Sequence, residues 1–327
     1  MEESSKRFSW KTLLLLEFIT VIIAVLGLAL IPKFDDAFYV NIPIVKLIFT
    51  IITNLGETIV FIILIAIIYI GYDKKFAKNL TFSLLITYYI NGVFKDIFKD
   101  PRPPSSSITD SYGFPSGHSQ TAVGFWGYVG YEFREKPRNY IIPILMAIII
   151  TLVALSRLII GVHDVQDVAG GLILGIGILI VFIYLEPIFT RKFNTFAIGI
   201  KIGLGVIVSI GLLFLGIVIF LMDNGDLGYA FADEGAYGQV AGVILGLSIG
   251  YILEQEYVKY EPKDMTVLQR ILNVIIGLAI LLVVYFLLEF LLHGNIFFRF
   301  IRYAVIALIL TLLLPYIFVK IYKPKRE

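Results

Sequence analysis

The sequence predicts an all-α integral membrane protein with about ten transmembrane helices. Hydrophobic residues make up 58% of the 327-residue chain and charged residues only 16%, and the mean hydropathy is +0.89. Soluble domains average about 45–50% apolar and about 25% charged residues, so this composition excludes both a soluble globule and a disordered chain. The apolar runs are continuous and lack the alternation of a transmembrane β-barrel, which favours helices.

Composition also excludes several classes of function. The chain has no cysteine, which excludes a disulfide framework, a thiolate metal site and a cysteine nucleophile. Its formal net charge of +2 does not supply the concentrated basic face of a nucleic-acid-binding protein, so we expect no nucleic-acid partner. The partners that we do expect are the bilayer and a substrate, and the sequence gives no indication of the oligomeric state.

Ten apolar stretches are long enough, or nearly so, to cross a hydrocarbon core of roughly 30 Å, which takes about 20 helical residues. They are residues 12–32, 56–72, 79–97, 117–133, 139–156, 165–185, 202–222, 235–253, 271–291 and 303–319. The segment 37–54 contains Asn41, Pro43 and Lys46 and is typical of an amphipathic helix at the membrane interface. The first span is too long for a signal-peptide core and has no small-residue cleavage site, so we expect it to be retained.

The basic residues predict the orientation of these spans. If the N-terminus is inside, the connections on that side hold 19 of the 27 Lys and Arg residues, as the positive-inside rule requires. We therefore expect a multi-pass protein of the plasma membrane with both termini cytoplasmic. Lys323 and Lys325 could instead form a dilysine retrieval signal in a eukaryotic host, but positive-inside anchoring explains them more simply.

Polar residues gather in three groups at the ends of predicted spans, and the predicted topology places all three groups on the non-cytoplasmic face. Lys95, Arg102 and Arg157 supply three cations suited to binding an anion with several oxygens. Ser116 and Gly117 open a predicted helix, whose free backbone N–H groups form a second kind of anion site.

Two histidines belong to the same set. His163 and Asp167 are four residues apart and share a helix face, so the carboxylate can hold one ring nitrogen and leave the other as a nucleophile or base. His118 is available as the acid that protonates a leaving oxygen. Each feature alone has an ordinary structural explanation. Chance is a poor explanation for their joint occurrence on one face of the membrane.

This pattern resembles the complete three-part signature of the type 2 phosphatidic acid phosphatase superfamily. The matching residues are Lys95-x6-Arg102-Pro103, Pro115-Ser116-Gly117-His118 and Ser156-Arg157-x5-His163-x3-Asp167. The signature occupies residues 95–167. The resemblance implies a six-helix phosphatase core over residues 1–190, which leaves residues 191–327 as a four-helix C-terminal extension of unknown role.

The resemblance also implies a role for each residue. His163 attacks phosphorus and becomes a phosphohistidine, Asp167 orients it, and His118 protonates the leaving group and later activates water. The phosphate oxygens are held by Lys95, Arg102, Arg157, Ser116 and the backbone at Gly117. No metal or other cofactor is implied, because cations and a helix N-terminus can stabilise the developing charge.

A site at the membrane interface favours a lipid phosphate over the soluble substrates that the same signature serves in acid phosphatases and haloperoxidases. We expect a metal-independent lipid phosphate phosphatase and favour a polyprenyl diphosphate as substrate, with phosphatidate or a sphingoid-base phosphate as alternatives. The sequence does not distinguish such a phosphatase from a lipid phosphotransferase that uses the same site. A transporter or scramblase is a remote alternative, since no repeat relates the two halves of the chain.

Two features of the extension predict how its helices pack. Gly242, Gly246 and Gly250 are spaced by four residues, which predicts close approach of a neighbouring helix. Glu289 and Arg302 are predicted to form a structural ion pair across a short connection.

Overall fold

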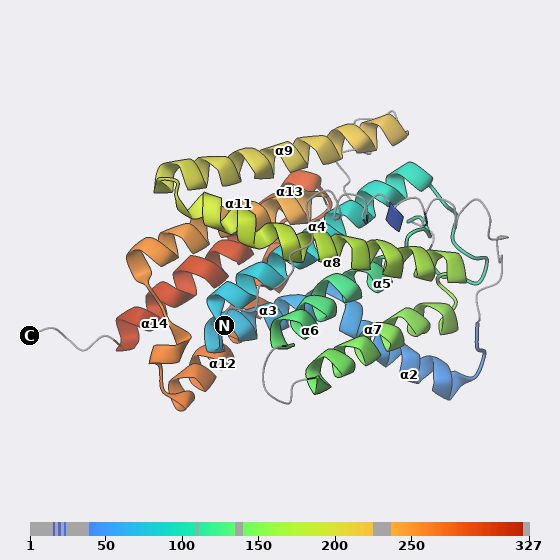
Figure 1. Ribbon diagram of the computed structural model, residues 1–327, viewed down its shortest axis with the longest axis horizontal. Coiled ribbons are helices and arrows are strands. Elements are labelled where there is room, and N and C mark those ends of the chain that lie inside the picture. The colour runs from blue at the N-terminus through green and yellow to red at the C-terminus, as the bar shows by residue number, and fades with distance from the viewer. Residues whose placement is uncertain are drawn as a thin grey trace, which may run out of the picture. The chain divides into compact units, whose positions relative to one another are not determined.

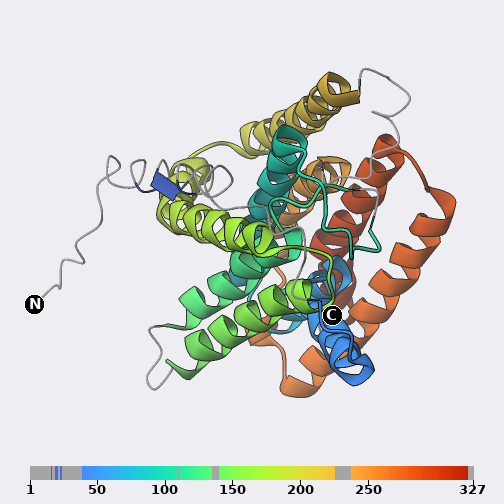
Figure 2. The same ribbon diagram turned by 90° about the vertical axis from the view of Figure 1, so that its right-hand side faces the viewer.

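In the computed structural model the chain folds into helices, and the residues that the structure describes form no strand (Figures 1 and 2). The described residues are 39–108, 111–134, 140–224 and 237–322, together with 16, 19, 20 and 23. Most of the predicted first span, and the lysines near the C-terminus, lie outside these residues. The predicted all-α membrane class is confirmed.

Six described helical segments are long and apolar enough to cross a membrane. They are α7 (Ile141–Ile159), α8 (Val165–Asn194), α9 (Ile198–Asn224), α11 (Tyr237–Leu253) with its π-helical end η3 (Glu254–Val258), α12 (Val267–Leu291), and the run of α13 (Ile296–Leu308), η5 (Ile309–Leu313) and α14 (Leu314–Tyr322). These segments correspond to the last six of the ten predicted spans.

Two predicted spans have a different character in the structure. Helix α4 (Lys74–Phe98) covers the predicted span 79–97, but it is less apolar than the six segments above. Several of its polar side chains are buried in the protein, with Asn79 5% exposed and Thr87 fully buried, so these groups face protein and not lipid. The predicted span 117–133 is a shorter stretch of three pieces, namely α5 (Gly117–Ala122), η2 (Val123–Gly127) and α6 (Tyr128–Phe133).

The predicted interfacial segment and the second predicted span form a broken pair of helices. Helix α2 (Pro43–Thr53) continues into the short helix η1 (Asn54–Gly56), and α3 (Thr58–Gly71) follows after a break at Glu57. If this pair counts as one broken span, the number of candidate spans rises to seven.

The chain forms two compact units. Unit 1 consists of residues 1–57 and 97–189, and unit 2 consists of residues 58–96 and 190–327. The predicted domains, residues 1–190 and 191–327, are continuous in sequence. Each compact unit instead combines two separate segments of the chain.

In unit 1, α7 packs against α2, α5 and α6 (Figure 1). Helix α8 is glycine-rich where it meets the segment that leads into α5. A Cβ atom at Gly170 would lie 2.1 Å from Phe114 Cε2, and one at Gly171 would lie 2.6 Å from the Ser116 carbonyl oxygen. These glycines therefore allow the two parts of the signature to lie in direct contact.

In unit 2, α11 packs against both α9 and α13. A Cβ atom at Gly242 would lie 2.2 Å from the Phe300 carbonyl oxygen, and one at Gly246 would lie 2.5 Å from the Ala304 carbonyl oxygen. The predicted close packing at these glycines is confirmed. The predicted ion pair is present as well, with Arg302 Nη1 2.5 Å from Glu289 Oε2.

Replacing Gly242 with alanine is expected to lower the free energy of unfolding by about 1–3 kcal/mol, because the new methyl group overlaps the backbone of α13. Thermal unfolding in detergent measures the change. Gly211→Ala on α9 is the matched control. A Cβ atom there meets no atom within 4 Å, so the helix gains up to about 1 kcal/mol from propensity. Equal losses in both variants would contradict this packing.

Candidate active site

His163 and Asp167 form a buried pair at the start of α8. His163 Nδ1 lies 2.7 Å from Asp167 Oδ2, and the two side chains are 2% and 0% exposed. Asp164 immediately precedes the helix, and its Oδ1 accepts the Asp167 backbone N–H at 2.8 Å, as a capping residue does. With Nδ1–H donating to the carboxylate, Nε2 carries the lone pair. This is the tautomer that a nucleophilic imidazole requires.

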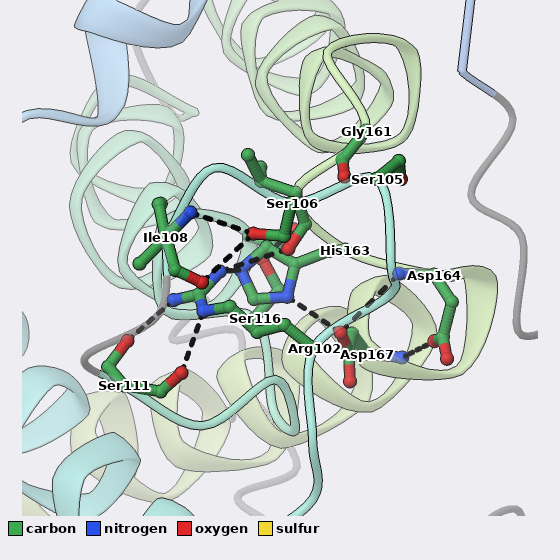
Figure 3. A network of polar contacts seen from close by, with 12 residues as sticks. Arg102, Ser105, Ser106, Ile108, Ser111, Ser116, Gly161, His163, Asp164 and Asp167 are labelled. Atoms are coloured by element: carbon green, nitrogen blue, oxygen red, sulfur yellow. Dashed lines mark hydrogen bonds and ion pairs between the residues drawn. The ribbon is translucent and has the colours of Figure 1, made fainter.

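Arg102 lies beside that lone pair. Its Nη1 is 3.1 Å from His163 Nε2 and donates to the Val162 carbonyl oxygen at 3.0 Å. Its Nε and Nη2 donate to the carbonyl oxygen and Oγ of Ser111 at 2.8 and 2.7 Å. Figure 3 shows the His163 ring between Asp167 on one side and the Arg102 guanidinium on the other. A phosphate bound by Arg102 would therefore meet Nε2.

Ser116 joins the second part of the signature to the third. Its backbone N–H donates to the Asp167 carbonyl oxygen at 2.9 Å, and its Oγ accepts from the Ser119 hydroxyl at 3.0 Å. Ser116 is fully buried, and Gly117 begins α5 directly after it. Their predicted contacts with phosphate stay a prediction.

Arg157 is a buried cation in the last turn of α7. It is 4% exposed, and its Nη1 donates to Thr53 Oγ1 at 2.7 Å. Its Nε has no hydrogen-bond partner among the described residues. Because buried guanidinium N–H groups are normally paired, an unused donor here fits a group that binds an anion.

Lys95 is the one predicted site residue that belongs to unit 2. It lies in the last turn of α4, whereas the other seven belong to unit 1. Its role as a third phosphate-binding cation stays a prediction.

His118 has a partner that the signature does not include. Its Nε2 lies 3.0 Å from Glu57 Oε1, and the two side chains are 23% and 46% exposed. The sequence carried one signal for Glu57, a lone carboxylate at the start of an apolar span. The sequence gives no signal for Thr53 and Ser111, which accept hydrogen bonds from Arg157 and Arg102. Isolated threonines and serines near span ends are common and form no motif.

The site also contains a group of acidic residues. Asp100, Asp164 and Asp167 place carboxylate oxygens within 4.8 Å of one another. Two of them already have structural tasks, since Asp164 caps α8 and Asp167 holds His163. The group in this region that suits an anion is the Arg102 guanidinium, whose Nη1 lies 3.1 Å from His163 Nε2.

Two family models match the chain. The model of the PAP2 superfamily matches residues 76–191, and the model of the transmembrane extension of PAP2 superfamily phosphatases matches residues 238–326.

Curated relatives match over different lengths. Human sphingosine-1-phosphate phosphatase 2 is 31% identical over 140 residues, which cover 40% of this chain and 35% of that protein. The chain thus spans about a third of that relative's length. Mouse sphingosine-1-phosphate phosphatase 1 is 24% identical over 313 residues, which cover 85% of this chain and 72% of that protein. Phosphatidylglycerophosphatase B of Bacillus subtilis is 33% identical over 137 residues, which cover 38% of this chain and 67% of that protein.

One solved structure is also similar. It is a transmembrane phosphatidylglycerolphosphate phosphatase of the PAP2 type from Bacillus subtilis, with a TM-score of 0.39 and 21% identity. The similarity covers 54% of this chain and 94% of that one.

Proposed function

The chain belongs to the PAP2 superfamily, and from this premise we propose that it is a membrane phosphatase that hydrolyses a lipid phosphate at His163. One observation carries the proposal. His163 donates from Nδ1 to the buried carboxylate of Asp167 and holds Nε2 3.1 Å from Arg102 Nη1. A nucleophilic nitrogen beside a cation is the arrangement that attack on a phosphate needs.

In the first step, the Nε2 lone pair of His163 attacks phosphorus and forms an N–P bond. The P–O bond to the lipid breaks, and His118 gives its proton to the leaving oxygen. Arg102 and Arg157 balance the charge on the phosphoryl oxygens, assisted by Lys95, Ser116 and Gly117. Asp167 stabilises the positive charge that the His163 ring acquires.

In the second step, His118 takes a proton from a water molecule that attacks the phosphohistidine. The N–P bond breaks, inorganic phosphate leaves, and His118 is again protonated for the next cycle. These two steps use only residues of this chain.

The substrate class that we propose is a lipid with a terminal phosphomonoester. The names of the relatives support it, since they state sphingosine 1-phosphate and phosphatidylglycerophosphate. The polyprenyl diphosphate that we favoured from the sequence is the competing candidate. We further propose a plasma-membrane location. Excess basic residues on one side of the predicted spans support an orientation with both termini cytoplasmic and a site that faces the other side.

Phosphate release by the purified protein in detergent tests the proposal. The substrates are sphingosine 1-phosphate, phosphatidate, phosphatidylglycerophosphate, a polyprenyl diphosphate and glucose 6-phosphate, each with and without chelator. We expect release from at least one lipid, little from glucose 6-phosphate, and rates that the chelator leaves unchanged. Loss of activity in chelator would contradict the proposed chemistry. A phosphorylated lipid acceptor with little free phosphate would indicate a phosphotransferase.

A further inference from the structure

We propose that Glu57, which lies outside the three-part signature, is a positioning residue that orients His118 for its role as general acid. This inference rests on the proposed function. Its basis is the contact of His118 Nε2 with Glu57 Oε1 at 3.0 Å, across 61 residues of sequence.

The turn that carries Glu57 is built against the active site. A Cβ atom at Gly56 would lie 2.9 Å from His118 Cδ2, so the imidazole packs directly on the backbone of this turn. Trp126 Nε1 donates to the Leu55 carbonyl oxygen at 3.0 Å and anchors the turn to η2, which directly follows α5 and its His118. Thr53, at the other end of the turn, accepts from Arg157. Residues 53–57 thus form a fourth part of the site.

The two histidines are held by carboxylates through opposite ring nitrogens. Asp167 holds His163 by Nδ1, which leaves Nε2 for phosphorus. Glu57 holds His118 by Nε2, which leaves Nδ1 as the ring nitrogen for the leaving oxygen and later for water. When His118 donates its Nδ1 proton, Nε2–H continues to donate to Glu57, so the ring keeps its orientation through both steps.

The charges that act on His118 explain why it needs this partner. Burial of the ring is the main reason that the pKa of His118 lies below its usual value, and the cations Arg157 from α7 and Arg102 from the loop before α5 lower it as well. Glu57 is the anion that acts on the ring in the opposite direction. Without Glu57, the pKa of His118 would fall further below its usual value.

Glu57→Gln tests the proposal, because the amide retains the size of the side chain and removes its charge. Rates are measured on a lipid phosphate, whose alkoxide must be protonated as it leaves, and on p-nitrophenyl phosphate, whose leaving group needs little protonation. We expect a loss of roughly 10–100-fold on the lipid and less than about 3-fold on p-nitrophenyl phosphate. The alkaline limb of the kcat/KM profile is expected to move to lower pH.

Two further variants complete the experiment. Glu57→Asp keeps a carboxylate and is expected to return the alkaline limb toward its wild-type position. Glu132→Gln, at an exposed carboxylate of α6, should match wild type in both rates and pH profile. An unchanged pH profile in Glu57→Gln, or equal losses on both substrates, would overturn the inference while wild-type activity still supports the proposed function. A wild-type protein that releases no phosphate would overturn both.

Discussion

Replacing His163 with alanine is expected to lower phosphate release from a lipid phosphate by at least about 10⁴-fold, because the substitution removes the nucleophile. The loss should appear in kcat/KM, measured in detergent on the best substrate of the panel. His293→Ala is the matched control, since that side chain is 80% exposed and lies in unit 2, and it should retain the wild-type rate within about 2-fold.

The buried pair with Asp167 requires a second check. His163→Ala also leaves the Asp167 carboxylate without its ring partner, so inactivity could come from unfolding. His163→Asn retains a donor of similar reach, and we expect it to be folded by thermal unfolding yet equally inactive. A folded His163 variant that turns over lipid phosphate at the wild-type rate would contradict the assignment of the nucleophile.

Replacing Glu254 with alanine is expected to lower the free energy of unfolding by about 3–5 kcal/mol. Glu254 is fully buried, and its two carboxylate oxygens lie 2.9 and 3.0 Å from Nζ of Lys74, whose side chain is 3% exposed. Glu254 also accepts the Tyr260 backbone N–H at 2.7 Å. Its removal leaves a buried cation whose remaining ionic partner among the described residues is the more exposed Glu261, 3.3 Å away. Thermal or denaturant unfolding in detergent measures the loss.

An exposed ion pair in the same unit serves as the control. Lys263 Nζ lies 2.8 Å from Asp73 Oδ2, but the lysine side chain is 67% exposed, so Lys263→Met should destabilise the protein far less than Glu254→Ala does. The double variant Lys74→Met with Glu254→Gln should lose less than Glu254→Ala alone, because it leaves no unpaired charge. Equal losses from the buried and the exposed pair would contradict the importance of burial.

The fold could be predicted where helices face lipid and less well where they face protein. The last six predicted spans are uniformly apolar and reappear as helices from α7 to α14. Helix α4 is different, because Asn79 and Asn91 are buried against protein, and the hydropathy of a sequence window does not separate such a helix from a lipid-facing one. The turn before the break at Glu57 is held by contacts with distant residues, and no local sequence pattern predicts such contacts.

The site divides in a similar way. Residues of one sequence block, such as His163 and Asp167, could be paired from their spacing, because a helix brings i and i+4 together. The contacts of Glu57 with His118 and of Thr53 with Arg157 span 61 and 104 residues, and only the folded chain brings these partners together. The sequence therefore predicted which residues react, and the structure added Glu57 and Thr53, which contact two of those predicted residues.

The central claim is that the phosphoryl group passes through His163, and direct detection of the phosphorylated residue tests it. The purified protein is mixed with a lipid phosphate labelled in its phosphate group, quenched within the first turnover, and digested for peptide mapping. We predict label on the peptide that contains His163, stable in alkali and lost in acid, and no label on that peptide in His163→Asn. Label on a different residue, or labelled phosphate released at the wild-type rate by His163→Asn, would contradict the claim.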